Sequence, residues 1–69
     1  MNLPKAIQQL RLEKSLTQTQ LIERCELGHN QLTRIEKGYS TPTIETLQRI
    51  CSELGVKLSE LIIKAENLN

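Results

Sequence analysis

The chain has 69 residues and a formal net charge of +1 at neutral pH, and this length predicts a single domain over residues 1–69. A domain of this size buries only about 60% of the surface that its unfolded chain exposes, and because Tyr39 is the single aromatic residue, leucine and isoleucine must form the core. The near-neutral charge excludes the overall basicity of a protein that coats nucleic acid nonspecifically, so a DNA-binding function must depend on where the charges lie.

The first predicted helix covers about residues 3–14, beginning at Leu3 or Pro4. Proline suits the first turn of a helix, and Leu3, Ile7 and Leu10 recur at the spacing of one apolar helical face.

A second predicted helix follows a clear start signal. Thr17 occupies the N-cap position with Gln20 three residues later, which is the capping-box arrangement. Leu21, Ile22 and Cys25 continue the apolar face. The pattern breaks at residues 26–28, where we expect Gly28 to supply the turn geometry.

A third predicted helix covers about residues 29–37 and ends at Gly38, a residue type favoured just after a helix C-terminus. Helical periodicity places Leu32 and Ile35 on its inner face. The opposite face presents His29, Asn30, Thr33, Arg34 and Lys37. Arginine is the usual bidentate partner of guanine and asparagine that of adenine in the major groove. The helix-turn-helix unit therefore covers about residues 17–37, although a single polar stripe is also typical of an ordinary solvated face.

The remaining sequence predicts two further helices and hence an all-α, five-helix domain. Pro42 disfavours helix at Thr41, and Thr43 caps a fourth helix that Gly55 ends. The expected buried residues of this helix, over 44–54, are Ile44, Leu47, Ile50, Cys51 and Leu54. Those of the fifth helix, over 58–66, are Leu58, Leu61, Ile62 and Ala65.

The sequence predicts no metal or cofactor. Cys25 and Cys51 lie on apolar faces without metal-site spacing, which favours buried thiols in a reducing compartment. Cys25 and His29 could form a ligand pair, but a structural zinc site needs four ligands. No apolar run approaches the roughly 20 residues of a membrane span, and the N-terminus lacks the features of a signal peptide. We expect a cytoplasmic protein.

An ordered set of residues, with its spacing, resembles the Cro/repressor-type (Xre-like) helix-turn-helix DNA-binding family, whose members form lambda-repressor-like domains. The resemblance extends over about residues 7–65. The matching residues are Thr17, Gln18, Leu21, Leu27, Leu32, Arg34, Ile35, Glu36 and Gly38, followed by Pro42 to Leu47, Leu54 to Val56 and Leu58 to Leu61. The chain departs from the family at Ile22, usually alanine, at Glu26, usually glycine, at Gly28, usually a capping serine or threonine, and at Lys57, usually serine.

The resemblance implies roles for particular residues. His29, Asn30, Thr33 and Arg34 would contact base edges. Gln18, Lys37, Tyr39 and Ser40 would contact the DNA backbone, with Gln18 also bracing the third helix. An ordinary polar loop is the alternative for Lys37, Tyr39 and Ser40. Arg11 and Glu36 would form an ion pair that ties the first helix to the third, or else remain exposed and unpaired.

These features predict a repressor-like transcriptional regulator that binds a palindromic operator as a homodimer. Ile63, which cannot face inward beside Ile62, and Leu68 are the candidate dimer contacts, although single exposed apolar residues are common. A phage repressor, a restriction-system controller and the antitoxin of a toxin–antitoxin pair all fit, the last with a toxin as protein partner. A purely protein-binding helical module is the competing class, and no catalytic constellation predicts an enzyme.

Overall fold

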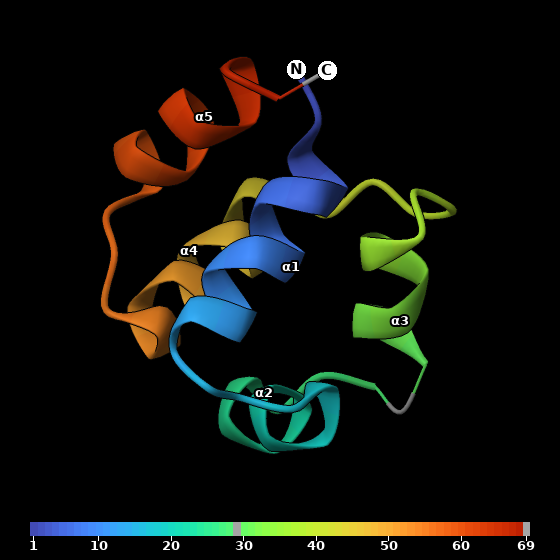
Figure 1. Cartoon of the computed structure of the whole chain (residues 1–69). Coiled ribbons are helices and arrows are strands. Elements are labelled where there is room, and N and C mark those ends of the chain that lie inside the picture. Colours follow the sequence, from blue (N-terminus) through green and yellow to red (C-terminus); the bar gives the residue numbers. More distant parts are fainter. Residues whose placement is uncertain (29, 69) are drawn as a thin grey trace.

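The computed structural model describes residues 1–28 and 30–68, which form five helices and no strand. Their bounds are Leu3–Glu13 (α1), Gln18–Cys25 (α2), Gln31–Glu36 (α3), Ile44–Leu54 (α4) and Leu58–Glu66 (α5). Figure 1 shows α1 in the centre, with α2 below it, α3 at its right, α5 at the upper left and α4 behind. The expected all-α fold is confirmed.

The predicted third helix was too long. The prediction placed its start at about residue 29, whereas α3 begins at Gln31, after a turn closed by Gly28 and Gln31. The Gln31 N–H donates to the Gly28 carbonyl oxygen at 3.0 Å, and the Gly28 N–H donates to the Gln31 side chain at 3.2 Å. Asn30 is therefore the N-cap residue of α3, and His29 lies outside the described residues.

Side chains cap the starts of α2 and α4 as predicted. The Gln20 N–H donates to Thr17 Oγ1 at 3.1 Å, and the Thr17 N–H donates to Gln20 Oε1 at 2.9 Å, which completes the capping box. The Thr46 N–H likewise donates to Thr43 Oγ1 at 3.2 Å. These side chains satisfy backbone donors that have no partner within their own helix.

The first four helices end in the same way. A residue in the left-handed conformation follows each helix, and the next residue bonds back to the last turn of that helix. The residue after each left-handed one donates its N–H to a carbonyl five positions earlier, which defines a Schellman motif. The left-handed residues are Ser15, Glu26, Gly38 and Gly55, with φ of 58°, 55°, 79° and 72°. The four bonds are Leu16 to Arg11, Leu27 to Ile22, Tyr39 to Arg34 and Val56 to Cys51. The turn after α2 thus depends on Glu26, and the expectation that Gly28 would supply its geometry was wrong.

The core lies where the five helices converge. Its fully buried side chains include Ile7, Leu21, Leu32, Ile35, Ile50 and Leu61. Leu47, Cys51 and Leu54 are buried as expected, but Ile44 is 60% exposed. Ile44 is the first residue of α4, and its neighbours on both sides are exposed, so the start of this helix lies at the surface. The prediction that Ile44 would be buried was therefore wrong.

The apolar residues of the last helix divide into buried and exposed ones. Leu61 and Ala65 are buried as predicted, Leu58 and Ile62 are only half-buried, and Ile63 is 59% exposed. Leu68, the other candidate dimer contact, is half-buried and packs against the core. Of the two candidate dimer contacts, Ile63 is therefore the one that is exposed.

Both cysteines are free thiols buried in the core, as expected. Burial raises the pKa of Cys25 to about 11, with Glu53 adding to the rise and Arg49 opposing it. Burial also raises the pKa of Cys51. Such thiols stay protonated and unreactive near neutral pH.

A hydrogen bond and an ion pair connect the N-terminal segment and α1 to the last helix. The Asn2 N–H donates to the Ala65 carbonyl oxygen at 2.8 Å, and Lys64 pairs with Glu13 across α5 and α1 at 3.0 Å. Figure 1 shows the start of the chain beside the end of α5. None of the helices that the structure describes is long and apolar enough to cross a membrane.

Candidate nucleic-acid interface

A buried ion pair connects α1 to the C-terminal end of α3. Arg11 Nε donates to Glu36 Oε2 at 2.8 Å, and Arg11 Nη2 donates to Glu36 Oε1 at 3.1 Å. Arg11 is only 6% exposed, and its Nη1 donates to the Leu16 carbonyl oxygen at 2.8 Å. The expected pairing is confirmed, and the guanidinium also holds the turn between α1 and α2. A planar guanidinium with three such bonds fixes orientation more strongly than a flexible ammonium group could.

Gln18, the first residue of α2, extends this network into the middle of α3. Its Nε2 donates to Glu36 Oε1 at 2.8 Å, and its Oε1 accepts from the Thr33 hydroxyl at 3.1 Å. One amide therefore spans two points of α3 that are nearly a turn apart. The expected bracing role of Gln18 is present in the structure, and the partner on α3 includes Thr33, which sequence reasoning had assigned only to base contacts.

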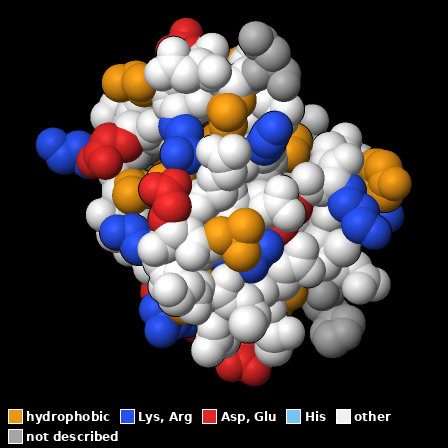
Figure 2. All heavy atoms as spheres, viewed as in Figure 1, with side chains coloured by type: hydrophobic (Ala, Val, Ile, Leu, Met, Phe, Trp, Pro, Cys, Tyr) orange, Lys and Arg blue, Asp and Glu red, His pale blue; other side chains and the backbone are white. Residues whose placement is uncertain are grey.

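The two faces of α3 differ as the periodicity predicted. Leu32 and Ile35 are fully buried, whereas Asn30 and Arg34 are exposed, as is Lys37 just after the helix. Figure 2 shows Lys and Arg side chains projecting over this edge of the molecule, at the right of the view. The outer surface of α3 therefore offers an amide and two cations while its inner surface is fixed to the core.

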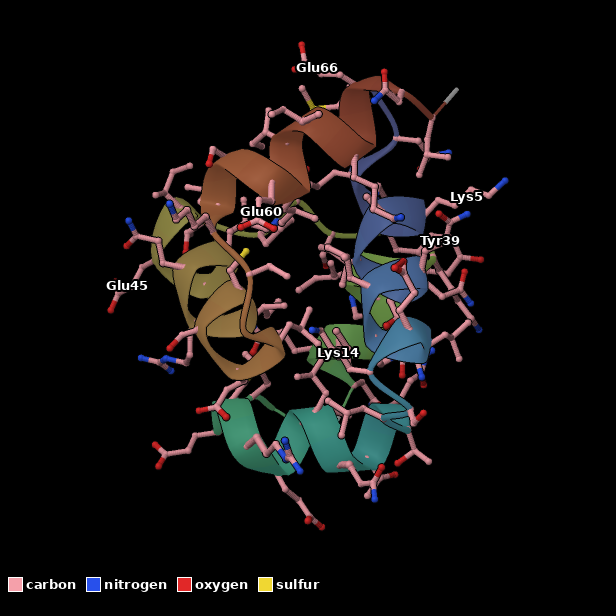
Figure 3. All side chains as sticks on the ribbon, turned by 60° about the vertical axis from the view of Figure 1, so that its left-hand side comes forward. Lys5, Lys14, Tyr39, Glu45, Glu60 and Glu66 are labelled. Atoms are coloured by element: carbon pink, nitrogen blue, oxygen red, sulfur yellow. The ribbon has the colours of Figure 1, made fainter. Side chains whose placement is uncertain are left out.

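The loop after α3 continues the polar edge. Arg34 Nε donates to Ser40 Oγ at 3.2 Å, a contact that sequence reasoning did not predict. Tyr39 is 71% exposed, and Figure 3 shows its side chain on the same side of the molecule as that of Lys5. Beneath the loop, a hollow of about 140 Å³ separates it from the start of α1. Its lining residues are Leu3, Pro4, Ile35, Gly38, Ser40, Thr41 and Pro42.

A second hollow, of about 310 Å³, lies between α2 and α3. Its lining residues are Gln18, Thr19, Ile22, Glu23, Asn30 and Thr33. Ile22, where the resembling family usually has alanine, is half-buried at this open edge and packs against the core. The larger side chain of Ile22 therefore fits at the open edge between α2 and α3 rather than between the two helices.

Most of the site residues predicted from the sequence lie on α3, beside it, or in contact with it. Asn30, Thr33, Arg34, Lys37 and Ser40 all belong to α3 or its flanks, and Gln18 contacts that helix directly. The position of His29 lies outside the described residues. Within residues 1–28 and 30–68, no three histidine, cysteine or acidic side chains group as a metal site would require.

Comparison with known proteins identifies the architecture. A family model described as helix-turn-helix matches residues 7–61. The immunity repressor protein of Bacillus phage phi105 is 32% identical to this chain over 62 residues, covering 90% of this chain and 43% of the phage protein. An uncharacterized HTH-type transcriptional regulator of Sinorhizobium fredii is 38% identical over 53 residues, covering 77% of this chain and 69% of the regulator.

The fold comparison agrees. The crystal structure of the clp gene regulator ClgR from Corynebacterium glutamicum matches with a TM-score of 0.91 and 26% sequence identity, covering 94% of this chain and 69% of that one. This chain spans about half the length, or less, of several relatives that it matches. Because that family model matches residues 7–61, most of the chain, the chain belongs to the helix-turn-helix family.

Proposed function

We propose that this protein binds double-stranded DNA sequence-specifically and regulates transcription as a repressor, with α3 as the recognition helix. The observation that carries the proposal is the two-sided character of α3. Leu32 and Ile35 fix its inner face, Glu36 is paired with Arg11, and the outer face presents exposed polar side chains. In helix-turn-helix proteins the second helix of the unit enters the major groove and contacts base edges. DNA binding would place the protein in the compartment that holds the DNA.

The exposed residues of α3 and its flanks divide by chemistry. Asn30 and Arg34 carry the groups that recognise adenine and guanine in pairs of hydrogen bonds, and with His29 and Thr33 they form the proposed base-reading set. Lys37, Tyr39, Ser40 and Gln18 would contact phosphates and set the register. The hydroxyl hydrogen of Thr33 is engaged by Gln18, so its methyl group and hydroxyl lone pairs remain for DNA.

Selection from a randomised duplex pool tests the base-reading residues. The wild-type protein should enrich a defined sequence. Arg34→Ala and Asn30→Ala should each weaken binding to that sequence by about 1–3 kcal/mol and relax preference at one base pair, because a bidentate contact is lost. Unchanged affinity and unchanged preference in both variants would contradict the assignment of α3 as the recognition helix.

Salt dependence tests the backbone contacts and the competing class. Lys37→Ala should weaken binding to all duplexes about equally and reduce the slope of log affinity against log salt by about one. Lys57→Ala, an exposed lysine at the start of α5, is the matched control and should leave the slope unchanged. A purely protein-binding module would show no steep salt dependence with any duplex, and this outcome would reject DNA binding.

We further propose that two copies bind a palindromic operator, since a lone domain contacts few base pairs and paired half-sites lie about 34 Å apart. The exposed Ile63 on α5 supports an isologous contact there. Ile63→Glu should then give a folded monomer by sedimentation. Ile44→Glu is a matched control, because Ile44 is equally exposed on a different helix. If only Ile44→Glu lowers the mass, the interface lies at the start of α4.

A further inference from the structure

The side chain of Arg34 has a partner in the loop that follows its own helix. Arg34 Nε donates to Ser40 Oγ at 3.2 Å. The backbone joins the same two residues, since the Arg34 carbonyl oxygen accepts from the Tyr39 N–H at 2.8 Å and from the Ser40 N–H at 3.3 Å. Ser40 is therefore held next to Arg34 by the backbone, and its hydroxyl oxygen is available to orient the guanidinium.

The backbone holds Ser40 in place. Gly38 adopts φ of 79°, which reverses the chain after α3 and brings Ser40 back toward Arg34. Ser40 is half-buried, and with Ile35 it lines the hollow beneath the loop. A half-buried hydroxyl whose own backbone N–H is bonded to the Arg34 carbonyl oxygen is a more fixed acceptor than one on a free surface side chain.

This contact leaves a particular part of Arg34 for DNA. A guanidinium has five N–H donors in a rigid plane. With Nε directed to Ser40, the four N–H groups on the two Nη atoms remain, and these can meet the guanine N7 and O6 acceptors end-on. An arginine side chain loses conformational entropy when it forms such a contact. Because Ser40 already restricts the Arg34 side chain in the free protein, less entropy is lost when DNA binds.

We propose that Ser40 is a positioning residue that sets base preference through Arg34, rather than only a phosphate contact. The inference rests on the proposed function of α3 as the recognition helix. It assigns a loop hydroxyl to specificity, and it predicts that Ser40 variants resemble Arg34 variants in kind, with a smaller effect.

The test compares a duplex enriched by the wild-type protein from a randomised pool with duplexes that differ from it at one base pair. Ser40→Ala should reduce discrimination at the Arg34-dependent base pair by about three- to tenfold, equivalent to one net hydrogen bond. Preference at other positions and the salt slope should stay unchanged. Ser40→Thr keeps the hydroxyl and should restore the discrimination, and Thr41→Ala, the neighbouring exposed hydroxyl, is the matched control.

A double-mutant cycle separates the two roles of Ser40. In an Arg34→Ala background, Ser40→Ala should have no further effect on base preference, because the group that it positions is absent. A uniform loss against every duplex, with no selective loss at the Arg34-dependent base pair, would identify a phosphate contact and overturn the inference, while leaving DNA binding by α3 intact. Failure of the wild-type protein to enrich any sequence would instead overturn the proposed function, and this inference with it.

Discussion

Removing the Glu36 carboxylate should destabilise the fold severely. In Glu36→Ala, the nearly buried Arg11 keeps its bond to the Leu16 carbonyl but loses both bonds to Glu36, and the Gln18 amide loses its acceptor. Removing one partner of a buried pair costs about 3–5 kcal/mol, because the other charge stays buried without compensation. A 69-residue domain has a free energy of unfolding of about 3–10 kcal/mol. Urea unfolding followed by helical circular dichroism should therefore show that the variant loses about 3–5 kcal/mol, a large fraction of the wild-type stability.

A surface pair in the same protein is the control. Glu13 and Lys64 also connect α1 to another helix at 3.0 Å, but their side chains are 56% and 29% exposed. Glu13→Ala should cost at most about 1 kcal/mol, as is usual for exposed pairs. Replacing both buried partners, as in Arg11→Met with Glu36→Leu, should recover much of the loss, because no charge is then left unpaired. If Glu36→Ala costs no more than Glu13→Ala, the burial of the pair does not have the energetic weight assigned to it.

Three further predictions concern backbone strain and thiol ionisation. Glu26→Gly should raise the free energy of unfolding by about 0.5–1 kcal/mol, because φ of 55° suits glycine, and an unchanged urea midpoint would argue against strain at this turn. Gly55→Ala should lower it by about 1 kcal/mol through the reverse effect, since a methyl group at Gly55 would meet no atom within 4 Å and only its φ of 72° opposes it. The Cys25 thiol has its ordinary pKa of 9.0 in the unfolded state and a pKa of about 11 in the folded state. The unfolded state therefore releases the proton first, and the free energy of unfolding falls as pH rises between these two values. The fall should be on the order of 2 kcal/mol larger than in Cys25→Ala, measured by urea unfolding at each pH, and parallel pH curves would show that this thiol is not perturbed.

The sequence predicted helix positions well wherever the signal was local. Thr17 and Thr43 cap their helices through contacts to residues three positions later, and Gly38 and Gly55 end theirs with positive φ. The misplaced turn after α2 shows the limit of such signals. A glycine permits left-handed geometry but does not require it, and the Schellman bond formed at Glu26 instead.

Contacts between elements were predictable only through family resemblance. Arg11 and Glu36 are 25 positions apart, so nothing in their spacing joins them. The bonds of Thr33 to Gln18 and of Arg34 to Ser40 depend on how helices and loops dock, which periodicity does not determine. Ile44 illustrates the same limit, because its register on α4 is correct for burial while the position of the helix start leaves it at the surface.

The shortness of α3 explains why the network around it matters for DNA recognition. A helix of six residues is far too short to be stable alone, so its orientation must come from its partners. Gln18 holds both Thr33 and Glu36, and a phosphate contact from this residue would use an amide that already positions the helix. A Gln18 variant would therefore lose affinity through two routes at once, and its effect could not be assigned to phosphate binding. Exposed groups such as Arg34 and Lys37 can be removed without disturbing the aim of α3, and their variants therefore report on DNA contacts directly.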